Sequence, residues 1–252
     1  MPRAPSPPTP SPLEDDALAP PSLCQRALRA LRRRVVGMRN TTLGSIALLA
    51  VLRMVACEPV RIEGASMEAT LLHGERALVA KYAYGLTPYG MSDSLVRWST
   101  PRPGDVVILR STTADAAIFV KRVIGIPGDT IEFRGDRPYR NGEALRVGAL
   151  GPCAVELQHR VDERCERYAE EVSGRRFEIT QSSRFRGDDS SAPVRVPEGH
   201  IYVLGDHRDE SLDSRALGPV PLSRVRGRVE RIYRSQRDDG SSRDDRRFQR
   251  VE

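Results

Sequence analysis

Short apolar runs separated by glycine and proline constrain the fold of this 252-residue chain more than any other feature. The clearest runs are rich in valine, isoleucine and phenylalanine: 105–109, 130–133, 177–180 and 201–204. Runs of this length favour strands, because a helix needs an apolar pattern sustained over about ten residues or more. The sequence therefore predicts a mainly β body at 58–230, a single domain with a β-rich insertion at 134–197.

The two ends of the chain differ from this body in composition. Residues 1–40 begin with a segment rich in proline and serine and continue with an arginine-rich segment, so we expect a disordered region there. Residues 231–252 mix arginine with aspartate and have no apolar face. We expect them to form a charged, solvated C-terminal tail.

Residues 41–57 are a candidate membrane anchor. This apolar segment has 17 residues, at the lower limit of about 17–25 for a spanning helix, and Arg53 lies near one end, where its side chain can reach the interface. The arginines upstream predict a cytoplasmic N-terminus and send the rest of the chain across the membrane. The alternatives are a buried core helix and the apolar part of a cleaved signal peptide, although the preceding segment is long for the latter.

Lysine usage points to a candidate general base. Only two of the forty basic residues are lysines, Lys81 and Lys121. Arginine stays protonated in proteins, whereas burial can make a lysine amine lose its proton. Lys121 directly follows the apolar run 116–120, so it is positioned for general-base chemistry. The alternative is a lysine that extends from a strand end to water.

A serine in a loop of small residues is the candidate nucleophile. Gly64 and Ala65 precede Ser66 and leave its hydroxyl and backbone N–H accessible. Met67 and Glu68 follow it, so the Gly-x-Ser-x-Gly signature of α/β-hydrolases is absent. No motif around any of the four histidines positions a triad base, which leaves a Ser-Lys arrangement. An ordinary turn serine is the alternative.

A third segment, 205–215, places many charges and hydroxyls directly after the apolar run 200–204. With it, the chain resembles the bacterial type I signal peptidases, membrane-anchored serine proteases with a Ser-Lys dyad. Four blocks in the family's order carry the resemblance: Ser-Met-Glu-x-Thr-Leu at 66–71, Arg-Pro-Gly-Asp at 102–105, Lys-Arg-x-x-Gly-x-Pro-Gly-Asp at 121–129, and Gly-Asp-x-Arg-Asp-x-Ser-x-Asp-Ser-Arg at 205–215. The resemblance extends from about Arg53 to Val229, and 134–197 is its least similar part.

The resemblance implies roles for individual residues. Ser66 would be the nucleophile and Lys121 the general base, within a catalytic β-sheet domain like that of signal peptidases and self-cleaving repressors. The implied supporting residues all lie in 205–215: Ser211, which would orient the lysine amine; Asp213 and Arg215, which would form an ion pair; and Asp206 and Ser214.

Four departures from the family pattern lie close to the implied site. Gly64 stands where some relatives have a serine that helps to bind the oxyanion, so the backbone N–H of Ser66, or the Gly64 backbone, must supply more of this binding. Ala69 replaces a common proline, which predicts a less rigid loop. His207 and Glu210 replace common asparagines, and the histidine brings a group that titrates near neutral pH.

The resemblance also implies a substrate. Apolar residues that match the family's shallow substrate cleft are Ile62, Met67, Leu71 and Val120, and they can also serve as core packing. Signal peptides end in a small-x-small cleavage site, and an extended strand presents alternate side chains to one wall. We therefore expect the partners to be signal peptides of exported preproteins and membrane lipid, for a monomeric enzyme of the bacterial inner membrane with a periplasmic catalytic domain.

Cysteines and charge add further expectations. Cys153 and Cys165 would both lie in the exported domain, where disulfides persist, so we predict that they pair, with two free thiols as the alternative. No Cys-x₂-Cys pattern occurs, and we expect no metal and no cofactor. The net charge of +6 is scattered without interleaved aromatic residues, so we expect no nucleic-acid partner.

Two other functions compete with this interpretation. A self-cleaving repressor would share the dyad but would need a DNA-binding helix-turn-helix, and residues 1–40 show no such pattern. A catalytically inactive, membrane-tethered homologue would bind extended peptides without cleaving them. Gly64 and Ala69 would then be signs of decay, whereas the presence of Ser66, Lys121 and Ser211 favours an enzyme.

Overall fold

The structure is a computed structural model. It describes residues 41–46, 57–86, 96–110, 118–153, 165–182, 192–236 and 240–251. The chain divides into two compact units, 1–50 and 51–252. In the first unit, residues 41–46 are helical and exposed.

The predicted anchor can be compared with the structure only in part. Residues 47–56, most of that anchor, and the whole of 1–40 lie outside the described residues. Within the described part of the chain, no helix is both long and apolar enough to cross a membrane. The anchor therefore stays a prediction.

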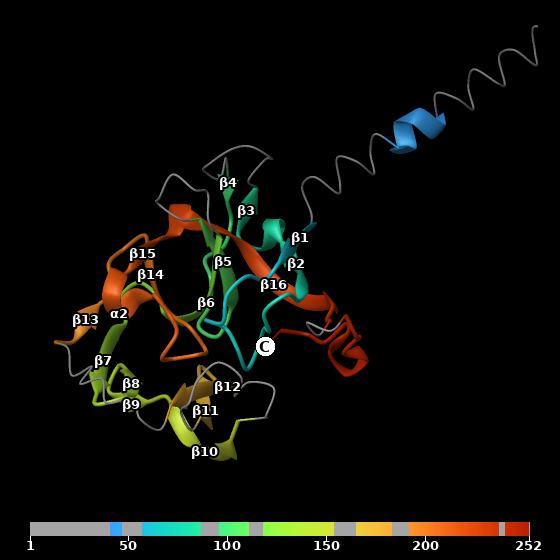
Figure 1. The fold of residues 1–252 in the computed structure, drawn as a ribbon. Coiled ribbons are helices and arrows are strands. Elements are labelled where there is room, and N and C mark those ends of the chain that lie inside the picture. The colour runs from blue at the N-terminus through green and yellow to red at the C-terminus, as the bar shows by residue number, and fades with distance from the viewer. Residues whose placement is uncertain are drawn as a thin grey trace, which may run out of the picture. The chain divides into compact units, whose positions relative to one another are not determined.

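A seven-stranded antiparallel sheet forms the centre of the second unit (Figure 1), with the strand order β1-β2-β16-β5-β6-β14-β15. Its strands are β1 (Cys57–Arg61), β2 (Arg76–Ala80), β5 (Val106–Arg110), β6 (Ile118–Gly125), β14 (His200–Leu204), β15 (Val220–Pro221) and β16 (Val225–Arg234). Strand β5 is buried along most of its length, as expected for a central strand covered on both faces.

Three smaller sheets and four short helical segments complete the described part of the second unit. The sheets comprise β3 (Gly85–Leu86) with β4 (Val96–Arg97); β13 (Val194–Arg195), β7 (Thr130–Arg134), β8 (Arg137–Arg140) and β9 (Glu143–Ala144); and β10 (Arg146–Pro152), β11 (Cys165–Val172) and β12 (Arg175–Ser182). The helical segments are η1 (Lys81–Ala83), α2 (Ser214–Leu217), η3 (Leu222–Arg224) and η4 (Asp244–Arg246). The four runs predicted as strands lie in β5, β7, β12 and β14, which confirms the mainly β fold.

Two apolar clusters cover opposite faces of the central sheet. Val106 and Ile108 of β5 belong to one cluster, whereas Val107 and Leu109 belong to the other. This alternation follows from the two-residue period of a strand. The first cluster also contains the apolar residues of the Ser66 turn, so the candidate nucleophile is built onto that face of the sheet.

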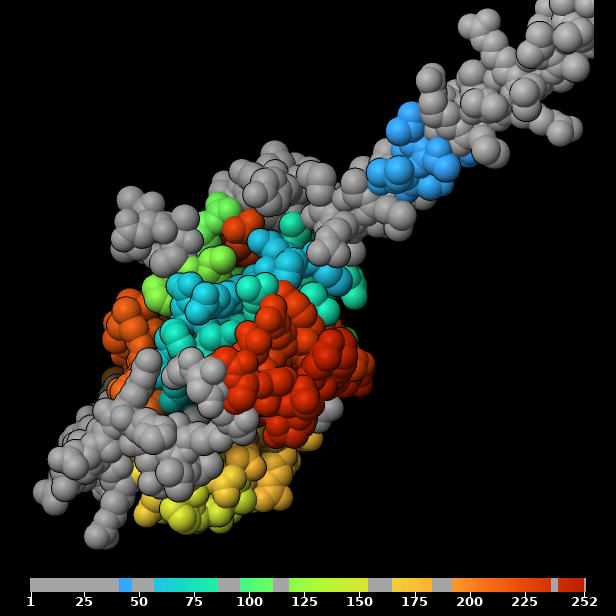
Figure 2. Space-filling view, turned by 45° about the vertical axis from the view of Figure 1, so that its right-hand side comes forward, coloured from blue at the N-terminus to red at the C-terminus, as the bar shows by residue number. Residues whose placement is uncertain are grey.

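The C-terminal residues 240–251 are mostly exposed, as expected for a solvated tail, but part of them also pairs with the central sheet. Strand β16 pairs with β5 only through its first part, Val225 to Arg228, which leaves one backbone edge of its later residues open. Residues 248–251 fill this edge: Phe248 N–H donates to the Ile232 carbonyl over 2.7 Å, and Val251 N–H donates to the Glu230 carbonyl over 3.1 Å. Because buried backbone groups need partners, pairing overrides the charged composition. Figure 2 shows the red C-terminal residues against the blue-green residues of the β1–β2 region.

Candidate active site

Ser66 and Lys121 meet at the centre of the predicted site. Lys121 lies in β6, Ser66 lies in the turn between β1 and β2, and Lys121 Nζ donates to Ser66 Oγ over 2.7 Å and to the Val120 carbonyl over 3.0 Å. Lys121 is only 3% exposed. Burial lowers the pKa of Lys121 to about 8, against the opposing influence of Asp213 and Asp206. The arrangement can therefore supply a neutral amine beside a hydroxyl near neutral pH.

The Ser66 loop, residues 62–75, is fixed at its ends and by apolar anchors. Ile62 N–H donates to the Glu75 carbonyl over 2.8 Å, and Gly74 N–H donates to the Ile62 carbonyl over 2.9 Å, which closes the loop. Met67 and Leu71 are buried in the first apolar cluster, and Leu71 N–H donates to the Met67 carbonyl over 2.8 Å. The hydroxyl-bearing residue thus sits beside two buried side chains that limit its movement.

The backbone donors near Ser66 differ in availability. The Gly64 N–H donates to Nδ1 of His73 over 3.0 Å, so it is already engaged. The Ser66 N–H has no hydrogen-bond partner among the described residues. Of the two backbone groups considered from the sequence, Ser66 N–H is thus the one free to bind an oxyanion. The role of His73 was missed, because nothing in its local sequence indicates a contact with Gly64.

A buried arginine joins three parts of the site. Arg122 is fully buried in β6, and its Nε and Nη2 donate to the two carboxylate oxygens of Asp206 over 2.9 and 2.8 Å. Its Nη2 also donates to Thr70 Oγ1 over 2.9 Å, and that hydroxyl donates to Asp206 over 2.5 Å. Strand β6, the Ser66 loop and the 205–215 segment are therefore held together. Sequence reasoning placed Asp206 here but missed Arg122 and Thr70, although both lie inside the family-like blocks.

Asp213 and Arg215 form the ion pair that the resemblance implies. Arg215 Nε and Nη2 donate to the two Asp213 oxygens over 2.9 and 3.0 Å. Burial alone would raise the pKa of the Asp213 carboxyl, but hydrogen bonds from Arg215 and the Gly205 N–H keep it below its ordinary value. Asp213 also caps α2, and Ser214 Oγ accepts from Val203 N–H over 3.0 Å. These bonds anchor the 205–215 segment to the end of β14.

Ser211 lies near Ser66, but its hydroxyl is not bonded to Lys121. A Cβ atom at Gly205 would collide with the Ser211 side chain and with the Ser66 carbonyl oxygen, so glycine permits this close approach. The buried Ser211 hydroxyl lies close enough to the Asp213 carboxylate to help lower the pKa of that group, although the contact does not reach full hydrogen-bond geometry. Its role in orienting the amine stays a prediction.

The insertion contributes to the site in a way that the sequence did not reveal. Arg208 forms a buried, two-pronged ion pair with Glu170 of β11, with Nη1 2.8 Å from Oε1. Thr180 of β12 donates its N–H to the Asp206 carbonyl over 2.9 Å and accepts from Arg208 N–H over 3.0 Å. Its hydroxyl donates to the Glu68 carbonyl over 3.3 Å. The insertion therefore supports both the Ser66 loop and the 205–215 segment, although it is the least family-like part of the chain.

His207 touches the nucleophile turn directly. Its backbone N–H donates to the Ser66 carbonyl over 3.1 Å, and its Nδ1 lies 3.6 Å from Glu68 Oε2. Burial lowers the pKa of His207, but Glu68 and the nearby Glu210 and Asp209 outweigh this and raise it above its ordinary value. The titratable group predicted from the sequence thus adjoins the candidate site.

The predicted substrate-binding residues lie together but face the core. Ile62, Met67, Leu71 and Val120 all belong to the first apolar cluster. Met67 and Leu71 are 1% and 0% exposed, which leaves little of their surface for a ligand. Their contact with a peptide stays a prediction.

Other predicted features can be located as well. A disulfide joins Cys153 and Cys165, with their Cα atoms 5.3 Å apart. Within the described ranges, no group of three or more histidine, cysteine, aspartate and glutamate side chains could hold a metal ion.

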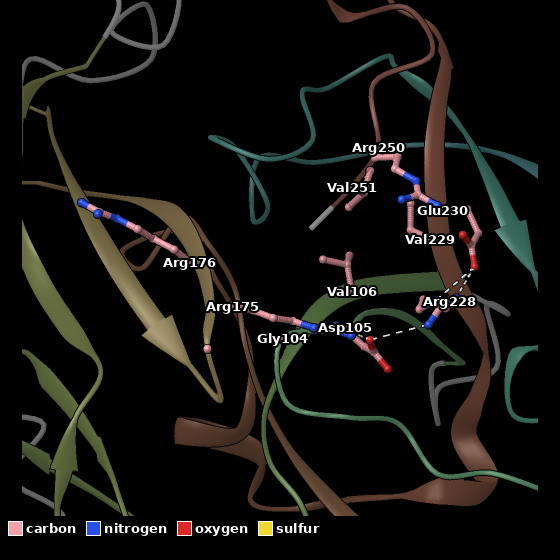
Figure 3. A pocket seen from close by; sticks show the side chains of 11 residues that line it. Gly104, Asp105, Val106, Arg175, Arg176, Arg228, Val229, Glu230, Arg250 and Val251 are labelled. Atoms are coloured by element: carbon pink, nitrogen blue, oxygen red, sulfur yellow. Dashed lines mark hydrogen bonds and ion pairs between the residues drawn. The ribbon is translucent and has the colours of Figure 1, made fainter.

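An open pocket of about 560 Å³ lies apart from the predicted site residues (Figure 3). Residues of β5, β12, β16 and the C-terminus line it, and most of its charges are paired across it. Arg175 donates to Asp105 over 2.6 Å, and Arg228 donates to Glu230 over 2.6 Å. The first of these ion pairs joins the β11–β12 hairpin to the central sheet, whereas the second lies within β16.

Known proteins resemble the chain over most of its length. The family model described as signal peptidase, peptidase S26, matches residues 35–234. Signal peptidase I of Pseudomonas fluorescens is 32% identical over 197 residues, covering 73% of this chain and 67% of that protein. Signal peptidase I of Bacillus licheniformis is 30% identical over 190 residues, covering 75% and 83%. A crystal structure of a signal peptidase I from Enterococcus faecalis is 28% identical and covers 52% of this chain and 97% of its own, with a TM-score of 0.31. The chain therefore belongs to the type I signal peptidases, the serine endopeptidases of family S26.

Proposed function

We propose that this chain is a membrane-bound endopeptidase that removes N-terminal signal peptides from exported preproteins at small-x-small sites. The observation that carries the proposal is the 2.7 Å contact between Lys121 Nζ and Ser66 Oγ in a buried setting. A nucleophile within hydrogen-bond reach of its base is the geometry that covalent catalysis requires. Membership of the signal peptidase family supports the same substrate class.

In the first half of the reaction, Ser66 attacks the scissile carbonyl carbon while its hydroxyl proton passes to Lys121. The amine must be neutral to accept that proton, and the pKa of about 8 makes a neutral fraction available. The Ser66 N–H, which has no hydrogen-bond partner in the described part of the chain, would stabilise the oxyanion that forms. Lys121, now protonated, then donates its proton to the leaving amine of the mature protein, which leaves the signal peptide esterified to Ser66.

In the second half, neutral Lys121 accepts a proton from a water molecule that attacks the ester carbonyl. The tetrahedral species collapses, the proton returns from Lys121 to Ser66 Oγ, and the signal peptide leaves with a free carboxylate. The same base therefore serves both steps, and no metal or cofactor is needed to balance them.

The neighbouring residues would keep this dyad in place. We assign Asp206 to holding Arg122 and Thr70, and Asp213 with Arg215 and Ser214 to holding the 205–215 segment. We assign Ser211 to orienting the amine once substrate is bound, because its buried hydroxyl lies near Ser66 and beside the Asp213 carboxylate. Fixed supporting groups reduce the cost of reaching the reactive geometry.

We further propose that residues 41–57 anchor the chain in the bacterial inner membrane and that the catalytic domain faces the periplasm. The arginine-rich residues before the anchor favour this orientation. The Cys153–Cys165 disulfide is consistent with an oxidising compartment.

The decisive experiment is cleavage of a preprotein with an Ala-x-Ala site by the detergent-solubilised full chain, beside Ser66→Ala. The wild-type protein should process this preprotein but should not process a version in which a bulky residue replaces the last alanine. The Ser66→Ala variant should process neither. A folded wild-type protein that binds the peptide without cleaving it would instead establish the inactive homologue. N-terminal sequencing of the product checks the cleavage position.

A further inference from the structure

The Ser66 loop ends at a fully buried carboxylate. Glu75 is 0% exposed, and its carboxylate accepts from Leu72 N–H over 2.9 Å and from Ser235 Oγ over 2.6 Å. A buried carboxylate is costly unless it is paired with a positive charge. Its guanidinium partner is Arg246 of η4, whose Nε donates to Oε1 over 2.7 Å.

Arg246 contacts the Ser66 loop at a second point. Its Nη2 donates to the Thr70 carbonyl over 2.8 Å, as well as to Glu75 Oε2 over 3.2 Å. The hydroxyl of the same Thr70 is bonded to Asp206 and Arg122. One C-terminal side chain therefore fixes both ends of residues 70–75 and meets the network that surrounds the dyad.

The segment that carries Arg246 is itself fixed to the central sheet. Phe248 and Val251 pair with β16 through their backbones, and Val251 packs against the first apolar cluster. Arg243 N–H donates to the Ser235 carbonyl over 3.1 Å, beside the hydroxyl that binds Glu75. The segment can thus act as a rigid support rather than as a loosely attached end.

We propose that residues 240–251 form a C-terminal strap that holds the Ser66 loop in its reactive position, and that Arg246 is a positioning residue for the reaction. This inference rests on the proposed function for its effect on catalysis. The strap acts through Glu75 and Thr70 and touches neither Ser66 nor Lys121. Because a displacement of about 1 Å can cost about 10²-fold in rate, such a support is catalytically significant.

The test compares Arg246→Ala and Arg246→Lys with Arg247→Ala, a matched control at an exposed neighbouring arginine. We expect Arg246→Ala to lower kcat by about 10²-fold with little change in KM, at a temperature where circular dichroism shows a folded protein. Arg246→Lys should recover part of kcat, because an ammonium can still pair with Glu75. Arg247→Ala should match wild type, and an Arg246→Ala enzyme with wild-type kcat would overturn the strap.

Two further measurements separate positioning from simple loss of stability. In Glu75→Gln/Arg246→Ala no unpaired carboxylate remains, so stability should recover while kcat stays low; full recovery of kcat would show that Arg246 is only a counter-ion and would overturn the proposal. The acid limb of the kcat/KM profile should also move to higher pH in Arg246→Ala, because a looser loop lets water reach Lys121 and favours its charged form. An unmoved limb would count against positioning.

Amide hydrogen exchange of residues 64–75 provides a readout that needs no activity. Arg246→Ala should exchange faster there than both wild type and Arg247→Ala. Unchanged exchange would overturn the strap even if wild type proved active. Conversely, the wild-type protein could cleave no preprotein while Arg246→Ala still exchanges faster than wild type at residues 64–75. That result would support the strap and reject the proposed function.

Discussion

The two lysines of the chain lie in two regions that give the lysine amine different partners. Lys81 in η1 is 6% exposed and Lys121 in β6 is 3% exposed, so both are buried. Lys81 Nζ lies 3.7 Å from the Glu58 carboxylate. Lys121 Nζ instead meets a hydroxyl and a carbonyl oxygen. A carboxylate favours an ammonium ion, whereas neutral oxygens leave the cost of burial uncompensated.

The difference teaches how a buried lysine can be kept near acidic residues and still become a base. Asp206 and Asp213 both act to raise the pKa of Lys121. Each of them is engaged by a guanidinium, Asp206 by Arg122 and Asp213 by Arg215. Burial then dominates and lowers the pKa to about 8. Because arginines neutralise both carboxylates, Asp206 and Asp213 do not form ion pairs with Lys121, and its amine can lose a proton near pH 8.

The largest effect expected from this comparison concerns activity. Lys121→Arg should lower kcat by about 10³-fold or more, because arginine keeps the charge and cannot become a neutral base. Lys81→Arg should remain active, since arginine can still pair with Glu58. Preprotein cleavage measures both, with circular dichroism as the control for folding. If both variants lost the same factor in kcat, Lys121 would not differ from Lys81 in its importance for catalysis.

Stability should respond to the two lysines in opposite directions. A lowered native pKa means that the unfolded chain binds more protons between pH 8 and 10.5, so the free energy of unfolding rises with pH in that window. Below about pH 8 the burial of charged Lys121 therefore destabilises the fold, by about 3 kcal/mol. Lys121→Met should be more stable than wild type at pH 7, and this gain should vanish above pH 10.5. Lys81→Met should lose about 1 kcal/mol, because Glu58 is left unpaired but partly solvated.

Urea unfolding at pH 7 and at pH 10.5 measures this contrast. The decisive quantity is the difference in the free energy of unfolding between Lys121→Met and wild type, and how this difference changes from pH 7 to pH 10.5. A difference that stays constant across this range would mean that Lys121 has no lowered pKa in the folded chain. The Lys81→Met variant controls for the general effect of replacing a buried lysine by methionine.

The pH profile of the wild-type enzyme should show the base directly. Below about pH 8, kcat/KM should fall about tenfold for each pH unit, because the neutral fraction of Lys121 falls by that factor. His207 also contacts the Ser66 turn, and its pKa is raised above its ordinary value. His207→Asn is therefore the control variant, and its kcat/KM should show the same fall below about pH 8. Loss of this fall in that variant would assign the titration to His207.

Local features were predictable from the sequence. Strands β5, β7, β12 and β14 follow from apolar runs bounded by glycine and proline, which are properties of neighbouring residues. Lys121 stood out from lysine usage and Ser66 from its loop of small residues, and the family-like blocks then joined both to the 205–215 segment. The structure then places Lys121 Nζ and Ser66 Oγ 2.7 Å apart, a distance that no local pattern specifies.

Long-range pairings were not predictable in the same way. Glu75 and Arg246 are 171 residues apart in sequence, and Glu170 and Arg208 are 38 apart. In a chain with 38 arginines, each one has many acidic candidates, and only the folded backbone selects among them. The pairing of the C-terminal residues with β16 was missed for the same reason, because their charged composition gives no sign of the open strand edge that they fill.

The smallest predicted effect concerns backbone strain beside the dyad, which residues 81–86 around Lys81 do not share. Ala69 adopts φ 102°, a region that costs an alanine about 1 kcal/mol or more. The sequence suggested that Ala69 loosens the loop by replacing a proline; however, proline, fixed near −65°, could not adopt this backbone at all. Ala69→Gly should therefore stabilise the fold by about 1 kcal/mol.

Ala144→Gly, at an exposed position in β9, is the matched control for Ala69→Gly. It should lose about 0.5–1 kcal/mol, because glycine costs more entropy where the backbone is unstrained. Urea unfolding of the two variants should thus give changes of opposite sign. If Ala69→Gly destabilised the fold as much as Ala144→Gly, the loop around Ser66 would store no strain, and the two lysine regions would differ only in the partners of their amines.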